Sequence, residues 1–561
     1  MKKLVLFAIL LILSDIAFSG GLLTNTNQSA QFIRMMSRNA SFDIDAVYFN
    51  PAGLIKLEDG WHFALYNQTI FQDKNVESKF LLLNDGVYKG GVKIPFFPTA
   101  FAVYKNKNWA FSLGFGPNSG GGLADFERGL PSFEIPITKV VPKLAGLTQI
   151  DPMLNVTGYD ANLYFNGSSV YWGIQLGATY KISDFISVYG GVRYMPAKNS
   201  YSGYIRDIMV EVGGESYGAP EWLLGTAGTV SDLATQATGA ANTFHATAGA
   251  LQPVIDGGAG ALTLEQLENN SIISPAQSAL IKAGLGMIGF NTEEINAMNI
   301  STIQGNFTSA GNQFNSKAEA LNNTAETLSA TSGQLADKEV ETEQTGAGFT
   351  PIIGVNISPN EDWNIALKYE HITYLKLKNK TKVDGLGLFP DGAESSSNVP
   401  AILGVGVGYR GLEWLEAQVS YNLYFNKGVD WGMNVRDLAV WKTVDQTKIQ
   451  HRAIEKNGFE LGLGLQFNIL DNFSFSIGGL YGDMGVAPSY QSDFSYSNPS
   501  FTPAAGIMWK ITDKITLDAG VSNSYYQDQT VIFNDPDIGS YEDVYGKTTL
   551  SCAVGLSFSI F

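Results

Sequence analysis

The feature that most constrains this chain is a two-residue alternation of apolar side chains with small or polar ones. Between residues 170 and 181 one face carries Val170, Trp172, Ile174, Leu176, Ala178 and Tyr180. The opposite face carries mainly small or polar residues such as Gly173, Gln175 and Thr179. The same alternation recurs in residues 403–410, 459–468 and 549–560. Successive side chains of a β-strand point to opposite faces, so each segment is predicted to be a strand.

The composition of the second face favours a membrane barrel over a soluble sandwich. A soluble sandwich has charged residues on its outer face, whereas here the second face is mostly Gly, Ser, Asn and Gln. Charged residues make up 16% of the 561 residues, below the ~25% typical of soluble domains. Aromatic residues make up 12%, and 61 residues are glycine. We therefore predict an all-β transmembrane barrel whose apolar face meets lipid and whose polar face lines the lumen.

The composition also argues against several function classes. A net charge of −17 gives no basic footprint for nucleic acid. The single cysteine, Cys552, cannot form an internal disulfide or a thiolate metal cluster. The four histidines are scattered without metal-ligand spacing, and Gly404, Gly406 and Gly408 follow the period of a strand rather than that of a phosphate loop. No enzyme activity, catalytic residue, metal or cofactor is predicted.

The N-terminus indicates export. Lys2 and Lys3 precede an apolar run over residues 4–13 and the small-residue end Ala17-Phe18-Ser19. This pattern is typical of a secretory signal peptide, predicted over residues 1–19, and the run is too short to span ~30 Å of hydrocarbon as a helix. Export and the composition together place the barrel in the outer membrane of a Gram-negative-type bacterium.

Connections of alternating length predict the number of strands. Six short turns lie near residues 106–108, 183–184, 359–362, 410–411, 471–472 and 512–514. Seven long polar stretches separate them: 72–95, 117–167, 211–346, 383–399, 427–456, 484–500 and 527–543. Thirteen connections imply about fourteen strands, with both termini on the periplasmic side.

Residues 20–60 precede the predicted barrel (61–561) and do not alternate. They contain too many apolar residues for a free periplasmic tail, among them Phe32, Met35, Met36, Phe42, Ile44, Tyr48 and Phe49. We predict that this segment packs inside the lumen as a plug, here called the hatch. Taken alone, Asn50, Pro51, Ala52 and Gly53 indicate only a turn.

The hatch sequence resembles that of the FadL family of outer-membrane transporters for long-chain fatty acids and other hydrophobic compounds. The resemblance rests on residues 37–57, with Asp43, Asp45 and the run from Tyr48 to Leu54, and extends along the mature chain. Two details differ: the acidic residues are spaced as Asp43-x-Asp45, and Phe561 falls on the lumen face of its strand. The resemblance implies a fourteen-stranded barrel with an N-terminal hatch and a ligand that leaves sideways through the wall.

A break in the third predicted strand is the second feature of interest. The strand that begins at Trp109 runs into a stretch rich in Gly and Pro, with Gly114, Gly116, Pro117, Gly120, Gly121 and Gly122. Proline cannot donate to the ladder, and clustered glycine lets a strand bend or open. One interpretation is the start of an external loop. The family resemblance instead implies a kink that opens a lateral window.

Residues 211–346 are predicted to form a helical extracellular insertion. Phe314, Leu321, Leu328 and Leu335 recur every seven residues, as do Val230, Ala237, Phe244 and Leu251, which predicts an antiparallel helical hairpin. Segments starting at Thr263 and Ser274 read as capping boxes. The insertion is interpreted either as a packed helical cap or as an external apolar groove that first captures a ligand.

A buried ligand carboxylate needs a cationic partner. Arg193 and Lys368 are candidates, because the alternation along their strands places both on the face that lines the lumen. The alternative is that each pairs with a lumen acid such as Glu370 or Glu460.

These features predict passive transport of fatty acids or other hydrophobic molecules by capture, hatch movement and lateral exit. The alternatives are a surface structural protein or adhesin that displays the insertion, and a general diffusion porin. Expected partners are the fatty-acid-like ligand, the bilayer with its lipopolysaccharide, and the barrel-assembly machinery; the barrel is expected to be a monomer and to bind no nucleic acid.

Overall fold

The computed structural model describes residues 28–385, 387–429, 454, 456–488 and 491–560. The predicted signal peptide and Phe561 lie outside these residues. The barrel strands that run without interruption are β1 (Gly60–Ser78), β2 (Val87–Asn106), β3 (Trp109–Phe126), β4 (Val156–Lys181), β5 (Ile186–Val212), β7 (Lys338–Ile357), β12 (Leu415–Tyr424), β13 (Gly458–Leu470), β14 (Phe473–Asp483), β15 (Ser500–Thr512) and β18 (Gly539–Ile560). The remaining strands are β6 (Glu215–Gly218), β8 (Trp363–Glu370), β9 (Lys376–Asp384), β10 (Glu394–Ser396), β11 (Ile402–Leu412), β16 (Ile515–Tyr526) and β17 (Gln529–Asp535).

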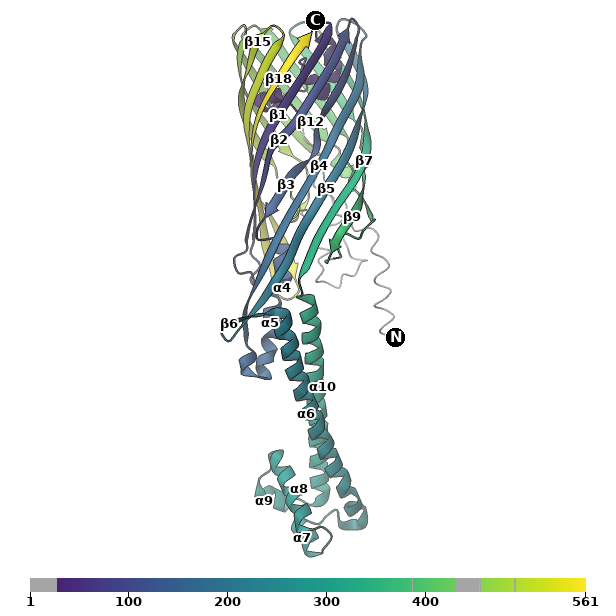
Figure 1. The fold of residues 1–561 in the computed structure, drawn as a ribbon, viewed down its shortest axis with the longest axis vertical. Helices are drawn as coiled ribbons and strands as arrows, with labels where there is room; N and C mark the ends of the chain where they lie inside the picture. The colour runs from purple at the N-terminus through teal and green to yellow at the C-terminus, as the bar shows by residue number, and fades with distance from the viewer. Residues whose placement is uncertain (1–27, 386, 430–453, 455, 489–490, 561) are drawn as a thin grey trace. The chain divides into compact units, whose positions relative to one another are not determined.

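The strands form one closed antiparallel barrel (Figure 1). β8 with β9, β10 with β11, and β16 with β17 are each one interrupted strand, while β6 pairs only with the end of β5. The described residues therefore form fourteen barrel strands, which confirms the predicted number. The barrel closes between β1 and β18, where Trp61 lies opposite Ile560.

The predicted alternation sets which side chains face inward. In β4, Tyr171, Gln175 and Thr179 are buried, whereas Ile174 and Leu176 on the other face are exposed. At the short-turn end of the barrel, outward aromatic rings pair across neighbouring strands, as Trp109 does with Tyr180 at 4.7 Å between ring centroids. Trp61 and Tyr104, and Trp363 and Tyr409, pair in the same way. Such rings are typical of the interfacial girdle of a membrane barrel.

Most of the predicted short turns are confirmed, but the long loops are shorter than expected. The turn expected at Arg410-Gly411 lies instead at Glu413-Trp414, because β11 continues to Leu412. The segments 72–95 and 117–167 were expected to be loops throughout, yet β1, β2, β3 and β4 extend well into them. Polar side chains hide the alternation there, while the backbone ladder continues, since its hydrogen bonds do not require apolar side chains.

The hatch packs inside the barrel, near the end at which the chain terminates (Figure 1). It comprises α2 (Ala30–Met35), α3 (Ala46–Phe49) and the 3₁₀ helix η2 (Pro51–Lys56). Ser29 caps α2 by accepting a hydrogen bond from the Phe32 amide. The hatch residues Phe32, Tyr48, Phe49 and Leu54 form a core with wall residues of β1, β2, β3 and β18.

The insertion forms a second compact unit, residues 144–160 with 207–336. Its long helices α6 (Ala219–Val254) and α10 (Ile300–Gln334) pack against each other, and both predicted heptad seams are largely buried. The shorter elements are η5 (Ile255–Ala259), α7 (Leu264–Asn269), α8 (Pro275–Met287) and α9 (Thr292–Ala297). Both predicted capping boxes are present, at Thr263 and Ser274. No helix among the described residues has the length and apolar character needed to cross a bilayer.

Shorter helical segments complete the described chain. They are α4 (Pro131–Thr138), α5 (Val140–Leu144), η3 (Ala145–Gln149), η4 (Pro152–Leu154) and η6 (Asn426–Gly428).

Candidate functional site

The motif Asn50-Pro51-Ala52-Gly53 docks the hatch onto the barrel wall. Thr179 of β4 donates to the Pro51 carbonyl at 2.6 Å, and Ser187 of β5 donates to the Ala52 carbonyl at 2.7 Å. The Asn50 amide donates to Asn356 of β7 at 2.7 Å and to the Ser41 carbonyl at 3.0 Å. A Cβ at Gly53 would lie 2.3 Å from the Asn50 side-chain nitrogen, which two hydrogen bonds hold in place, and 2.9 Å from the Ser41 backbone oxygen, so this position favours glycine. The motif is therefore a docking element rather than a simple turn.

Asp45 is the centre of the internal hydrogen-bond network of the hatch. Its carboxylate is fully buried and accepts two hydrogen bonds from Arg38, both at 2.8 Å. It also accepts hydrogen bonds from Ser29 at 2.9 Å and Ser41 at 2.7 Å. Asp45 thus joins the start of α2 to the loop that precedes α3. A bidentate pair of this kind is among the strongest hydrogen-bonded contacts in proteins.

The second acidic residue of the hatch, Asp43, has a half-exposed side chain that contacts Arg38 at 2.5 Å. Burial alone would raise the pKa of Asp43, but the charges of Arg38 and Arg410 outweigh this effect and lower the pKa to about 2. Asp43 is therefore ionised at neutral pH, and its negative charge offsets the positive charges of Arg38 and Arg410.

Arg34 ties α2 to the opposite side of the wall. Its guanidinium donates to Asp518 of β16 at 2.9 Å, to Gln466 of β13 at 2.6 Å and to Ser476 of β14 at 2.5 Å. The Arg34 side chain is 1% exposed, and so is that of Asp518. The hatch is thus held from both sides of the lumen, by Arg34 and by the Asn50–Gly53 motif.

Lumen glycines let the hatch backbone lie directly against the wall. A Cβ at Gly478 of β14 would lie 1.9 Å from the Met35 carbonyl oxygen, and one at Gly406 of β11 would lie 2.4 Å from the Asn39 carbonyl carbon. Since no side chain fits in these gaps, the predicted lumen glycine of β11 has a packing role.

The two predicted ligand-binding cations, Arg193 and Lys368, both contact Glu370 and lie against the ring of the hatch residue Tyr48. Arg193 lies 2.5 Å from one Glu370 carboxylate oxygen, and Lys368 lies 2.7 Å from the other. Both cations lie over the ring of Tyr48, at 4.9 and 4.5 Å from its centroid, and Lys368 donates to the Tyr48 carbonyl at 2.6 Å. Arg193 and Lys368 thus pair with the lumen acid Glu370, which is the alternative that the sequence left open to binding a ligand carboxylate. Two cations share one carboxylate, which leaves one positive charge against the hatch.

The wall ladder between β2 and β3 is interrupted beside the hatch. The strands pair from Asn106 to Ala100 of β2 and resume at Val92, and no pairs are formed between these points. On β3 the interruption faces residues 116–123, where the pairing with β4 also shifts twice. Gly120 has a φ of +100°, and a Cβ there would lie 2.2 Å from the Ser169 carbonyl oxygen. The predicted Gly/Pro run therefore coincides with a break in the wall.

Hatch and wall meet at this break. Gln28 donates to the Pro117 carbonyl at 2.5 Å, and a Cβ at Gly116 would lie 2.5 Å from the Gln28 side-chain oxygen. On the β2 side, the Phe97 backbone amide donates a hydrogen bond of 2.9 Å to the side-chain oxygen of Asn67 of β1 instead of to a β3 residue. Side chains thus replace ladder hydrogen bonds at the break, and the Phe97 amide is not left unpaired.

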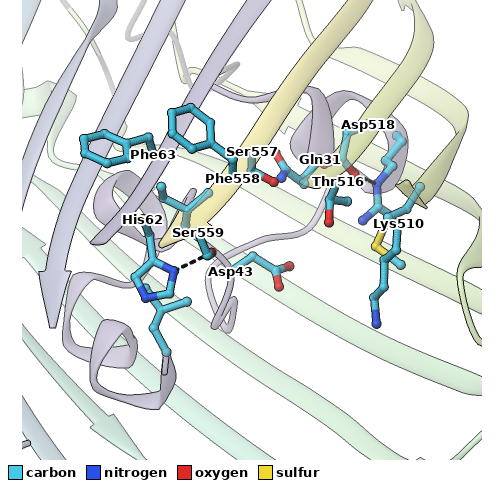
Figure 2. A pocket seen from close by; sticks show the side chains of 14 residues that line it. Gln31, Asp43, His62, Phe63, Lys510, Thr516, Asp518, Ser557, Phe558 and Ser559 are labelled. Carbon is cyan, nitrogen blue, oxygen red and sulfur yellow. Dashed lines mark hydrogen bonds and ion pairs between the residues drawn. The ribbon is translucent and has the colours of Figure 1, made fainter. Parts of the chain in front are cut away.

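A cavity of about 160 Å³ lies between the hatch and β1, β15, β16 and β18, at the short-turn end of the barrel (Figure 2). Charged and polar side chains line much of it, including Arg34, Asp43, Lys510 and Asp518. His62 and Ser559 share a hydrogen bond of 2.7 Å at its edge. Such a lining suits water better than a hydrocarbon chain.

The sequence located some of these residues but not others. The structure brings Arg193 and Lys368 together at Glu370, and it places Gly116, Pro117 and Gly120 at the wall break. Gly114 lies within the regular part of β3, opposite Phe101. Two hatch cations were missed. Arg34 takes its partners from the wall strands β13, β14 and β16, which show no local signal for it, and Arg38 pairs inside the hatch with Asp43 and Asp45.

Comparison with solved structures identifies the fold. The chain superposes on a FadL homologue from Pseudomonas aeruginosa with a TM-score of 0.53 and 12% identity, covering 97% of this chain and 100% of that one. The toluene transporter TodX of P. putida gives a TM-score of 0.46 at 10% identity over 92% of this chain and 94% of its own. No protein-family model and no curated protein sequence matches the chain. The predicted resemblance to FadL is confirmed at the level of the fold.

Proposed function

We propose that this chain, which shares the fold of a FadL homologue, is a non-enzymatic outer-membrane channel for hydrophobic small molecules. The observation that carries the proposal is the interrupted β2–β3 ladder, with the hatch residue Gln28 bound at its edge. A plug that touches a break in the wall ladder can couple its own movement to the opening of that break. The fatty-acid type of ligand is the finer part of the proposal.

The proposed route has three stages. The helical insertion collects the ligand, the lumen above the hatch holds it, and hatch movement releases it between β2 and β3. That passage is kept open by Gly116, Pro117, Gly120, Gly121 and Gly122. Gly114 lies just before them, in the regular part of β3. Displacement of Tyr48 would free one positive charge at Arg193 and Lys368 for a ligand carboxylate.

Lateral release is favoured by solvation. Each buried CH₂ group contributes about 0.8 kcal/mol, so an alkyl chain gains nothing by entering water. The cavity under the hatch is lined by Arg34, Asp43, Lys510 and Asp518, which disfavours passage of a hydrocarbon there. The outer-membrane bilayer is therefore both the surroundings of the barrel and the destination of the ligand. We further propose that the barrel acts as a monomer inserted by the barrel-assembly machinery.

Uptake of labelled fatty acid in a strain that lacks the gene tests the proposal. Expression of the intact chain should restore uptake above that of the empty vector. Equal uptake in the two strains would contradict transport. High steady conductance of the purified barrel in planar bilayers would favour a diffusion porin, because a hatch that fills the lumen passes little ion current.

A further inference from the structure

Two lysines lie directly opposite each other on the lumen face of the seam that closes the barrel. Lys74 of β1 and Lys547 of β18 are register partners. Both belong to the inward-facing set of their strands, with Val76 next to Lys74 and Tyr545 next to Lys547 on the same face and buried. The Lys547 side chain is 8% exposed. Directly opposite side chains of neighbouring strands have Cβ atoms ~5 Å apart, so the two ammonium groups share one region of the lumen.

Two tyrosine rings lie beside the ammonium groups. The Lys547 nitrogen lies 4.5 Å from the ring centroid of Tyr526 and 5.5 Å from that of Tyr496, and the Lys74 nitrogen lies 5.8 Å from the Tyr496 centroid. Lys547 also donates to the Tyr496 carbonyl at 3.3 Å. Among the residues that the structure describes, no carboxylate oxygen lies within 4.0 Å of either nitrogen.

This lack of a carboxylate distinguishes Lys547 from the other buried cations of the described chain. Each of the others contacts an acid: Arg34 contacts Asp518, Arg38 contacts Asp45, and Arg193 and Lys368 contact Glu370. Like charges opposite each other in a sheet are destabilising, and a buried ammonium without a counter-charge is costly. Cation–π contacts with Tyr496 and Tyr526 offset part of this cost. The remaining positive potential favours an anion.

The position of the pair separates it from Arg193 and Lys368. Tyr66 of β1 packs against the hatch, and Lys74 lies eight residues further along the same strand. At ~3.3 Å per residue this is about 26 Å along the strand, toward the end with the long connections. A ligand that enters from that end reaches Lys74 and Lys547 before it reaches the hatch.

We propose that Lys74 and Lys547 form an anion site for the carboxylate of an amphiphilic monocarboxylate, with the Tyr496 and Tyr526 rings beside its first methylene groups. This inference rests on the proposed transport function and makes the ligand class more specific: a long-chain carboxylate is preferred over a neutral hydrocarbon. The carboxylate accepts hydrogen bonds from both ammonium groups and removes their mutual repulsion.

Equilibrium binding to the purified full chain in a neutral detergent tests the site. The probes are labelled hexadecanoate and hexadecan-1-ol, which differ in charge but not in chain length. In the double variant Lys74→Met with Lys547→Met, hexadecanoate affinity should fall by roughly tenfold or more, the usual size of a lost charged hydrogen bond, while hexadecanol affinity stays the same. The matched control is Lys382→Met, an exposed lysine paired with Glu341. The charge-retaining double variant with Lys74→Arg and Lys547→Arg should keep hexadecanoate binding.

Unchanged hexadecanoate affinity in the double Met variant would overturn the site while leaving transport intact. A wild-type chain that binds neither probe would instead contradict the proposed function itself. A measurement without any variant covers the case in which the double variant fails to fold. Reductive methylation of the wild-type chain, read by mass spectrometry, should be slowed at Lys74 and Lys547 by hexadecanoate but not by hexadecanol. Equal methylation with both probes would refute the inference.

Discussion

Replacing Asp45 with Asn should release the hatch while leaving the barrel intact. The Asp45 carboxylate is fully buried and accepts hydrogen bonds from Arg38, Ser29 and Ser41. Removing one partner of a buried ion pair costs about 3–5 kcal/mol, because the remaining charge stays buried. At about 1.36 kcal/mol per tenfold change, the opening equilibrium of the hatch should rise by roughly two to almost four powers of ten.

Hydrogen exchange of the backbone amides measures this opening locally. Amides of α2, α3 and η2 should exchange faster in Asp45→Asn by that factor, while those of β13 and β14 should not change, since the strand ladder does not depend on the hatch. Asp43→Asn is the matched control, because Asp43 contacts the same Arg38 from a half-exposed position. Exposed pairs contribute about 0–1 kcal/mol, so its effect should stay below about tenfold. Equal exchange in the two variants would refute the role given to Asp45.

Three further outcomes are expected. Gly478→Leu should displace the hatch and raise single-channel conductance, because a Cβ at this position would lie 1.9 Å from the Met35 carbonyl oxygen. The control Gly479→Leu should leave the conductance unchanged, because a Cβ there would meet only the Phe501 ring, at 3.4 Å. The pKa of Asp43 is lowered to about 2, so the ionised carboxylate stabilises the hatch fully above about pH 4, and this stabilisation is lost as the pH falls toward 2. Protection of the hatch amides from hydrogen exchange should therefore decline in that window, and the decline should be smaller in Asp43→Asn. Deleting residues 215–336, which leaves β7 intact, should reduce but not abolish fatty-acid uptake; complete loss of surface adhesion with unchanged uptake would favour the adhesin instead.

The regular wall was the part of the fold that sequence could predict. Alternation reports which side of a strand is apolar, and this was enough to assign inward and outward faces in β4 and β13. The same signal failed where both faces are polar, as around Asp73 and Asn75 of β1, which lie in a segment expected to be a loop. Strand pairing continues there through the backbone alone.

The contacts that hold the hatch could not be read from the sequence. Arg34 and Asp518 form a buried pair although they lie 484 residues apart. Lumen parity placed Arg193 and Lys368 inside, yet it could not show that both reach Glu370 and Tyr48. Register across a closed barrel sets these pairings, and a single chain carries no local signal of that register.

The lateral route is the central claim, and a reversible cross-link across the wall break tests it most directly. A Cβ at Gly116 would lie 3.1 Å from a side-chain carbon of Thr99, which is within reach of a disulfide between the two strands; only the flexible end of Gln28 must move. In a Cys552→Ser background, the double variant Thr99→Cys with Gly116→Cys should lose fatty-acid uptake when oxidised and regain it on reduction. Undiminished uptake by the fully oxidised protein would contradict exit between β2 and β3.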